Sequence, residues 1–252
     1  MTVPEVPTAP PGSAFDPAAY RRARAAEGRL LDDALVARLP ALPGSHPLAA
    51  EWALRGQTAD RFRAWLAGTP APRTVLDVGC GTGWFSAALA GVPGTRVIGI
   101  DLEGPELEQA KRVFAARQGI AFAAGDAETI DAARLAPDVI VLASVIQYLA
   151  DPAAVIARLL RACRPAGSVH VLDSPLYRPD ELAGAAERTA AHYARIGVPG
   201  QAAGYHHHAF GSFAELEPVV VQGRPPRWRL SLAARVGRPI SPFPWLRFDR
   251  GT

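Results

Sequence analysis

The sequence predicts an α/β fold with a doubly wound, mostly parallel seven-stranded sheet that carries helices on both faces. One observation behind this prediction is that short, continuously apolar runs alternate with helical stretches, which is typical of parallel strands covered on both sides. A second observation is a glycine-rich loop that joins the first strand to a helix. The parallel strands expected are Thr74–Val78, Arg96–Ile100, Ile120–Ala124, Asp138–Ala143 and Ser168–Asp173.

Helices connect these strands, and a less regular region follows them. Beyond Asp173 the alternation is lost, and a helix over Pro179–Ile196 is expected there. Two late strands, Pro218–Val221 and Trp228–Ala234, would complete the seven, joined by a turn at residues 223–226, and the tail could hold one more short strand. Between the parallel strands the expected helices are Trp84–Ala90, Glu106–Arg117 and Pro152–Cys163.

The first 70 residues are predicted to be a mainly helical preface to the sheet. Residues 1–15 hold four prolines and are expected to form a flexible arm. A helix is expected from Asp16 to about Leu39, because Asp16 can cap it and proline follows at the first helical position. A second helix should cover Leu48–Leu66. The domains expected are therefore the arm at 1–15, a helical cap at 16–70 and a main domain at 71–252, with an insertion at about 174–212.

Composition and charge argue against several classes of protein. The net charge is +3, but the positive residues are almost all scattered arginines, with Lys111 as the only lysine, so neither a nucleic acid nor a membrane is expected as a partner. Cys80 and Cys163 are too few for a disulfide framework, which predicts a cytoplasmic location. No apolar window is long enough for a transmembrane helix, and Met1–Gly12 lacks the pattern of a secretory signal.

The most informative stretch is the loop from Asp77 to Gly83, in which glycines stand at positions 79, 81 and 83. Glycines allow positive φ angles and a close approach of the backbone to a ligand, and the helix that follows presents free N–H groups. A dinucleotide fingerprint needs its third glycine at position 84, where the bulky Trp84 stands. NAD and FAD are therefore disfavoured, and the lack of a following Gly-Lys-Ser/Thr excludes a P-loop.

The pattern Asp-x-Gly-x-Gly-x-Gly resembles the first motif of class I S-adenosylmethionine (SAM) dependent methyltransferases, which have a Rossmann-like fold. Further motifs follow in the family's order. Asp101 ends the second strand, Asp126 follows the third, and the fourth strand runs into Ser144. The segment Leu160–Ser168 resembles the family's turn before strand five, with alanine in place of one glycine. The resemblance covers roughly residues 70–175.

The resemblance implies SAM as the cofactor and S-adenosyl-L-homocysteine as its product. In the family, the acid after strand two binds the ribose hydroxyls, the acid after strand three binds the adenine amino group, and the acid before the glycines contacts the methionyl amino group. Tyr20, in the N-terminal helix, is expected to close over the methionyl end. The insertion after strand five resembles a bacterial subgroup in which this segment forms a lid. Carried onto this chain, the cofactor-binding residues are Asp77, Gly79, Cys80, Gly81, Gly83, Asp101, Leu102, Asp126, Ala127, Ser144 and Tyr20.

The acceptor half of the site is harder to predict. The family's Asn/Asp-Pro-Pro-Tyr/Phe motif for planar amino groups is absent after strand four, where Ser144–Gln147 stands. A nucleic-acid base is therefore disfavoured, and a small molecule, such as a secondary metabolite, is expected to accept the methyl group by in-line SN2 displacement. Tyr177, just after strand five, and His207 and His208, in the run Tyr205–His208, are the candidate catalytic residues.

Several alternatives stay open. The chain could methylate oxygen, nitrogen or carbon, could bind SAM but catalyse a non-methylating reaction such as cyclisation, or could be a non-catalytic SAM-sensing module. No metal site is predicted, although His206 and His208 would point to the same side of an extended segment, where a polar loop is the alternative. The sequence decides neither the acceptor, nor a metal requirement, nor the formation of a homodimer.

Overall fold

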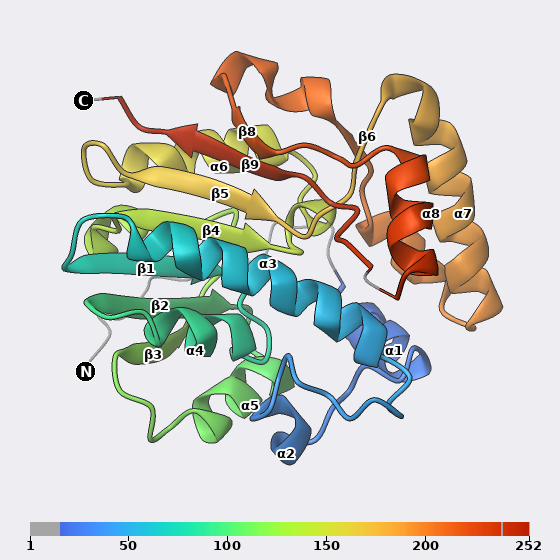
Figure 1. The fold of residues 1–252 in the computed structure, drawn as a ribbon, viewed down its shortest axis with the longest axis horizontal. Helices are drawn as coiled ribbons and strands as arrows, with labels where there is room; N and C mark the ends of the chain where they lie inside the picture. The colour runs from blue at the N-terminus through green and yellow to red at the C-terminus, as the bar shows by residue number, and fades with distance from the viewer. Residues whose placement is uncertain (1–15, 238, 252) are drawn as a thin grey trace.

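The computed structural model describes residues 16–237 and 239–251, and its centre is a seven-stranded sheet of order β3-β2-β1-β4-β5-β9-β8 (Figure 1). The first five strands in this order pair in parallel, whereas β9 runs antiparallel to both β5 and β8. The predicted doubly wound, mostly parallel seven-stranded sheet is therefore confirmed. Its strands are β1 (Arg73–Val78), β2 (Thr95–Asp101), β3 (Ile120–Ala124), β4 (Val139–Ala143), β5 (Ser168–Leu172), β8 (Val219–Gln222) and β9 (Trp245–Asp249).

Helices precede, connect and follow these strands. A small second sheet joins β6 (Leu176–Tyr177) to β7 (His208–Ala209), within the predicted lid segment. Short 3₁₀ helices cover Ala132–Leu135, Ile146–Tyr148, Pro179–Glu181, Pro199–Gly204 and Phe210–Leu216. The α-helices are α1 (Pro17–Ala26), α2 (Asp33–Val36), α3 (Ala49–Ala67), α4 (Trp84–Ala90), α5 (Pro105–Val113), α6 (Pro152–Ala162), α7 (Leu182–Arg195) and α8 (Arg227–Arg235).

Each face of the sheet has its own apolar core. On one face, residues of α3 and α4 such as Phe62 and Leu89 pack with Val75 of β1. On the other face, residues of α6 such as Ile156 pack with Leu76, the next residue of the same strand. Successive residues of a strand point to opposite faces, so a continuously apolar strand such as β1 serves both cores. All six residues of β1 are buried, which explains the apolar run that predicted it.

The parallel strands end at one edge of the sheet, and two cavities lie there. Helices α1, α7 and α8 gather beyond this edge (Figure 1). Crevices at the carboxyl ends of parallel strands are where such sheets bind ligands. Among the described residues, no helix has the length and apolar character needed to cross a membrane.

The N-terminal helix is shorter than predicted. Asp16 caps it through the Ala18 N–H and Pro17 follows, as expected, but α1 ends at Ala26 rather than near Leu39. Gly28 has a φ of 67°, a left-handed conformation that terminates the helix. The second expected helix is confirmed as α3. The arm predicted at residues 1–15 lies outside the described residues.

One predicted late strand is wrong. Trp228–Ala234 was expected to be a strand, but it belongs to helix α8. The segment Leu232–Arg235 is rich in good helix formers, and Pro226, directly before the helix, has the extended backbone typical of an N-cap residue. The place of that strand in the sheet is taken by β9, in the tail, where a short strand was considered. The expected turn at residues 223–226 therefore leads into a helix.

Candidate cofactor and acceptor site

The glycine loop after β1 has a shape that side chains would prevent. Gly79 and Gly83 have φ angles of 74° and 76°. A Cβ atom on Gly79 would lie 2.5 Å from a methyl carbon of Val145, and one on Gly83 would lie 2.6 Å from the ring of Phe122. Gly81 also has a positive φ, of 53°, but open space surrounds its Cβ position. Close packing explains why positions 79 and 83 need glycine. Gly81, in contrast, leaves open space beside the loop.

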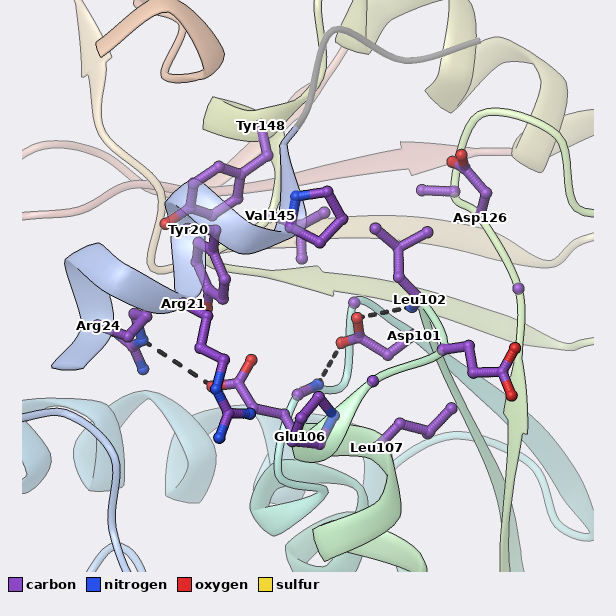
Figure 2. Close-up of a pocket in the computed structure, with 18 of the residues that line it drawn as sticks. Tyr20, Arg21, Arg24, Asp101, Leu102, Glu106, Leu107, Asp126, Val145 and Tyr148 are labelled. Atoms are coloured by element: carbon purple, nitrogen blue, oxygen red, sulfur yellow. Dashed lines mark hydrogen bonds and ion pairs between the residues drawn. The ribbon is translucent and has the colours of Figure 1, made fainter. Parts of the chain in front are cut away.

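The carboxylate of Asp101 accepts two backbone hydrogen bonds, one from this loop and one from the residue that follows Asp101. Its Oδ2 accepts from the N–H of Gly81 at 2.5 Å, and its Oδ1 accepts from the N–H of Leu102 at 2.7 Å (Figure 2). Burial raises the pKa of Asp101 to about 6, although the Gly81 hydrogen bond opposes the rise. Each carboxylate oxygen has a second lone pair, so the group can still accept hydrogen bonds from a ligand.

Asp77 is a buried residue of β1, two positions before the first glycine of the loop. Its Oδ2 accepts a 2.5 Å hydrogen bond from the hydroxyl of Ser86 on α4. Burial raises the pKa of Asp77 to about 7, so near neutral pH the carboxyl group is shared between its charged and neutral forms. Burial also raises the pKa of the neighbouring Cys80, which therefore stays a thiol.

A cavity of about 210 Å³ lies between α1 and the ends of the strands (Figure 2). Asp126 faces it, with its Oδ1 fixed by the N–H of Glu128 at 2.8 Å. Because Asp101 and Asp126 follow neighbouring parallel strands, they approach the cavity from adjacent positions along the sheet edge. The predicted cofactor residues that line this cavity are Tyr20, Gly79, Gly81, Asp101, Leu102, Asp126, Ala127 and Ser144.

A second, larger cavity of about 830 Å³ adjoins the first. Asp77 and Cys80 line it from the loop, and α3, α7 and the segment after α8 supply other walls. Gly83 lines neither of these two cavities. The residues that line both are Tyr20, Arg24, Gly79, Gly81, Glu106, Ser144 and Tyr148. The two spaces are therefore neighbouring compartments of one site.

Tyr20 and Tyr148 stand at the boundary between the compartments. Their rings meet edge to face, with centroids 5.4 Å apart, and the guanidinium of Arg24 lies 5.7 Å from the Tyr20 ring centre. Arg24 also forms an ion pair with Glu106 of α5 at 4.0 Å (Figure 2). These contacts fix α1 over the sheet edge. Tyr20 thus lines both cavities from α1, and the expectation that it closes over the methionyl end of a cofactor stays a prediction.

Paired charges line the larger cavity. Arg29 forms ion pairs with Glu27 at 2.9 Å and with Glu51 at 2.5 Å. Arg55 also contacts Glu51, and its Nη1 donates to the hydroxyl of Ser144 at 3.1 Å. This network joins α3 to the end of β4. Sequence reasoning missed it, because nothing local in the sequence connects Glu51 or Arg55 to Ser144.

The predicted catalytic residues lie in different surroundings. Tyr177 lines the larger cavity, and burial raises its pKa. His207 lines neither cavity described above, and its Nε2 is hydrogen-bonded to Thr189 at 2.8 Å. His208 is buried away from both cavities, and its Nε2 donates to the carbonyl of Ile146 at 2.9 Å. Only Tyr177 of the three thus faces the space where an acceptor could bind.

The run of three histidines does not form a recognisable metal centre. Within residues 16–237 and 239–251, no group of three or more His, Cys, Asp or Glu side chains is placed to hold a metal ion. The rings of His206 and His208 lie 6.1 Å apart. His206 and His208 were expected to point to the same side. The described residues do not add the further ligands that a metal site would need beside them.

A comparison with protein families identifies the central part of the chain. Residues 75–167 match the family described as "Methyltransferase domain". This segment contains the glycine loop, Asp101, Asp126 and Ser144, and it includes strands β2, β3 and β4 and most of β1. Residues 75–167 are therefore similar to a methyltransferase domain, the kind of domain that the motifs predicted.

Curated relatives match over the same region. The chain is 39% identical over 114 residues to a trans-aconitate 2-methyltransferase of Methylobacterium radiotolerans, covering 45% of this chain and 40% of the relative. It is 33% identical over 100 residues to a malonyl-[acyl-carrier protein] O-methyltransferase of Halalkalibacterium halodurans, covering 38% and 37%. The match with a ubiquinone biosynthesis O-methyltransferase of Thiobacillus denitrificans is 37% over 109 residues, covering 42% and 45%. The chain thus aligns with less than half the length of each relative.

Solved structures share the fold more widely. The SAM-dependent methyltransferase SibL has a TM-score of 0.50 and 21% identity, covering 86% of this chain and 62% of its own. Phosphoethanolamine N-methyltransferase 2 of Haemonchus contortus, solved in complex with SAM, has a TM-score of 0.53 and 16% identity, covering 78% and 53%. At such identities the likeness shows the fold alone.

Proposed function

We propose that this chain transfers a methyl group from SAM to a small-molecule acceptor by in-line SN2 displacement. The observation that carries the proposal is the pair of adjoining cavities at the edge of the sheet, which share the wall formed by Gly79, Gly81 and Ser144. One compartment has the acids expected for the nucleoside half of a cofactor. The other is large enough for an acceptor and has Asp77 in its wall.

The residues in the smaller compartment fit the proposed cofactor. Asp101 offers carboxylate lone pairs to ribose hydroxyls, and Asp126 offers them to the adenine amino group. The open space beside Gly81 would allow the backbone to lie against the ligand. At the methionyl end, Asp77 would face a positively charged amino group. SAM, when bound, supplies a methyl group on an electrophilic sulfonium, so the chain mainly has to hold and orient the reactants.

Tyr177 is proposed to orient the acceptor rather than to deprotonate it. Because burial raises its pKa, its hydroxyl stays protonated at neutral pH and can donate a hydrogen bond. Asp173, which also lines the larger cavity, is better suited to take a proton from an alcohol or phenol. Its Oδ1 accepts from the hydroxyl of Thr58 at 2.7 Å, which fixes its position, and burial raises its pKa.

The named relatives support oxygen as the atom that is methylated. Two of them are O-methyltransferases, of malonyl-[acyl-carrier protein] and in ubiquinone biosynthesis. They match this chain mainly in the cofactor-binding region, so the acceptor of this chain is a separate proposal.

We place the acceptor in the larger cavity. There it would lie under the lid at about 174–212, which belongs to the main domain at 71–252, and beside the helical cap at 16–70. A cytoplasmic location and a homodimer stay predictions.

Product mass tests the proposal. The purified chain would be incubated with SAM carrying a trideuteromethyl group and with small hydroxy acids, carboxylic acids and phenols. Methyl transfer predicts a product that carries the label, formed in equal amount with S-adenosylhomocysteine. A product without the label would support a non-methylating reaction such as cyclisation. Cofactor binding without turnover of any acceptor would support a SAM-sensing module, against which the size of the larger cavity argues.

A further inference from the structure

Helix α8 turns its larger apolar side chains away from the protein. Trp228, Leu232 and Val236 follow one another at intervals of four residues and are 66%, 53% and 62% exposed. This spacing places them on one face of the helix. The side toward the protein has only Leu230 and Ala233, both half-buried. An ordinary surface helix shows the reverse arrangement, with its main apolar stripe against the core.

Exposed apolar residues are concentrated in this part of the chain. Among the described residues, Leu30 is the one large exposed hydrophobic residue that lies elsewhere. The rest are Val219–Val221 of β8, Trp228 and Leu232 of α8, and Val236, which directly follows α8. Single exposed apolar residues are normal on protein surfaces, whereas their accumulation in one segment indicates an interaction surface.

The same segment is strongly basic. Between Pro218 and Phe248 the sequence has six arginines, no lysine and no acidic residue. Arg227, Arg229 and Arg235 of α8 are exposed, and none of them forms an ion pair with a described residue. Projected on a helix, Arg235 and Arg229 flank the apolar stripe on its two sides. An apolar face bordered by arginines is typical of helices that lie in the interface of a membrane with anionic lipids.

This helix is attached next to the larger cavity. Arg224, just before α8, forms an ion pair with Glu181 at the start of α7, at 2.6 Å. Just after α8, the carbonyl of Pro239 accepts from the side chain of Gln57 on α3, at 2.9 Å. The chain then continues through residues 239–243, four of which line the larger cavity. Figure 1 shows α8 beside α7, beyond the ends of the parallel strands.

We propose that α8 docks this end of the molecule on an anionic lipid surface. Trp228, Leu232 and Val236 enter the interfacial layer, and the arginines beside them contact lipid phosphates. This docking would place the larger cavity near molecules dissolved in the membrane. A second copy of the chain is a poorer occupant of the face, because a symmetric contact would bring arginines against arginines. The proposal revises the expectation that no membrane is a partner, and it does not depend on methyl transfer.

Vesicle flotation with the full chain tests the proposal. The vesicles would contain phosphatidylcholine alone or with about one third phosphatidylglycerol. Binding to the anionic vesicles is expected, with little binding to the neutral ones. Trp228→Ser with Leu232→Ser should weaken it more than about tenfold, because apolar burial is lost. Arg229→Gln and Arg235→Gln should each weaken it about fivefold, the effect of one arginine near the surface.

Matched controls separate docking from general effects of charge or hydrophobicity. Leu30→Ser removes an exposed leucine outside the segment, and Arg96→Gln removes an exposed arginine on β2, so neither should alter vesicle binding. Trp228→Phe should retain binding but lose a blue shift of tryptophan emission. The proposal is overturned if neither vesicle binds, or if both bind equally. It is also overturned if the serine variants bind vesicles as well as the parent chain does. Two further results would contradict it: substitutions in α8 that dissociate a dimer, or substitutions in α8 that weaken binding to an acidic protein without changing vesicle binding.

Discussion

The backbone N–H of Gly81 donates to the carboxylate of Asp101 over 2.5 Å, which joins the loop after β1 to the end of β2. This bond fixes the acid beside the one glycine of the loop whose Cβ position is open. The loop and the acid therefore act as a single unit, with the remaining lone pairs of Asp101 available to a ligand. The proposed cofactor site depends on this unit.

Asp77 is expected to reduce the stability of the fold when it is charged. Its pKa is raised from 3.8 to about 7, so the folded state holds the proton more tightly than the unfolded state. Stability is therefore lost as pH rises from about 4 to about 7. Asp77→Asn should raise the free energy of unfolding at pH 8 by on the order of a few kcal/mol and change it little near pH 3. Urea unfolding at both pH values checks this, and a less stable variant at pH 8 would contradict it.

SAM binding should release protons near neutral pH. Burial raises the pKa of Asp77 to about 7 in the free protein, and a bound ammonium group would favour the charged form and lower that pKa. The released protons appear as a dependence of the binding enthalpy on the ionisation enthalpy of the buffer. This dependence should be much weaker at pH 9, and in Asp77→Asn at pH 7. Equal release by the parent chain and by Asp77→Asn would place the coupled proton elsewhere.

Gly79 and Gly81 should respond differently to alanine. Both need a left-handed backbone, which costs roughly 1–2 kcal/mol for a residue with a Cβ atom. At Gly79 the added carbon would also collide with Val145, so Gly79→Ala should lower the unfolding free energy further. Gly81→Ala should be the more stable variant but should bind SAM more weakly, because its methyl group occupies the space beside the loop. Thermal unfolding and SAM titration of both variants check this, and the opposite order of stability would contradict it.

Tyr20 should contribute to SAM affinity from the wall between the compartments. Tyr20→Ala removes a ring that lines both cavities, and the contact of an aromatic ring with a bound ligand contributes about 0.5–1.5 kcal/mol. A loss of SAM affinity of roughly 2- to 10-fold is therefore expected. Arg22→Ala, on the same helix and outside both cavities, is the control. Unchanged affinity in Tyr20→Ala would remove this residue from the proposed cofactor site.

The sheet could be predicted from the sequence because its strands are continuously apolar, and β3 and α4 have the predicted bounds. The prediction failed where the pattern was ambiguous. Leucines between positions 30 and 39 suggested a continued helix, but Gly28 interrupts it. Trp228–Ala234 was predicted as a strand from its apolar residues, although the spacing of Trp228 and Leu232 by four residues was already that of a helix face.

The candidate site was predictable only in part for a similar reason. The loop and the acids that follow β2 and β3 are short motifs, so their residues could be named from sequence. The ion pair of Arg29 with Glu51 and the hydrogen bond of Arg55 to Ser144 depend on the packing of α3 against distant segments. Arg55 and Ser144, for example, are 89 positions apart. His207 was a plausible base by residue type, but its hydrogen bond with Thr189 could not be foreseen.

Calorimetric titration with SAM and with S-adenosylhomocysteine tests the central claim most directly. It would compare the parent chain with Asp101→Asn, and with Asp131→Asn as a control, since Asp131 pairs with Arg134 outside both cavities. We expect both ligands to bind the parent chain and the control with micromolar affinity. Asp101→Asn should bind roughly 10- to 100-fold more weakly, because hydrogen bonds to a charged group contribute about 1.5–3 kcal/mol. Failure of the folded parent chain to bind either ligand would contradict the account, as would equal binding by Asp101→Asn.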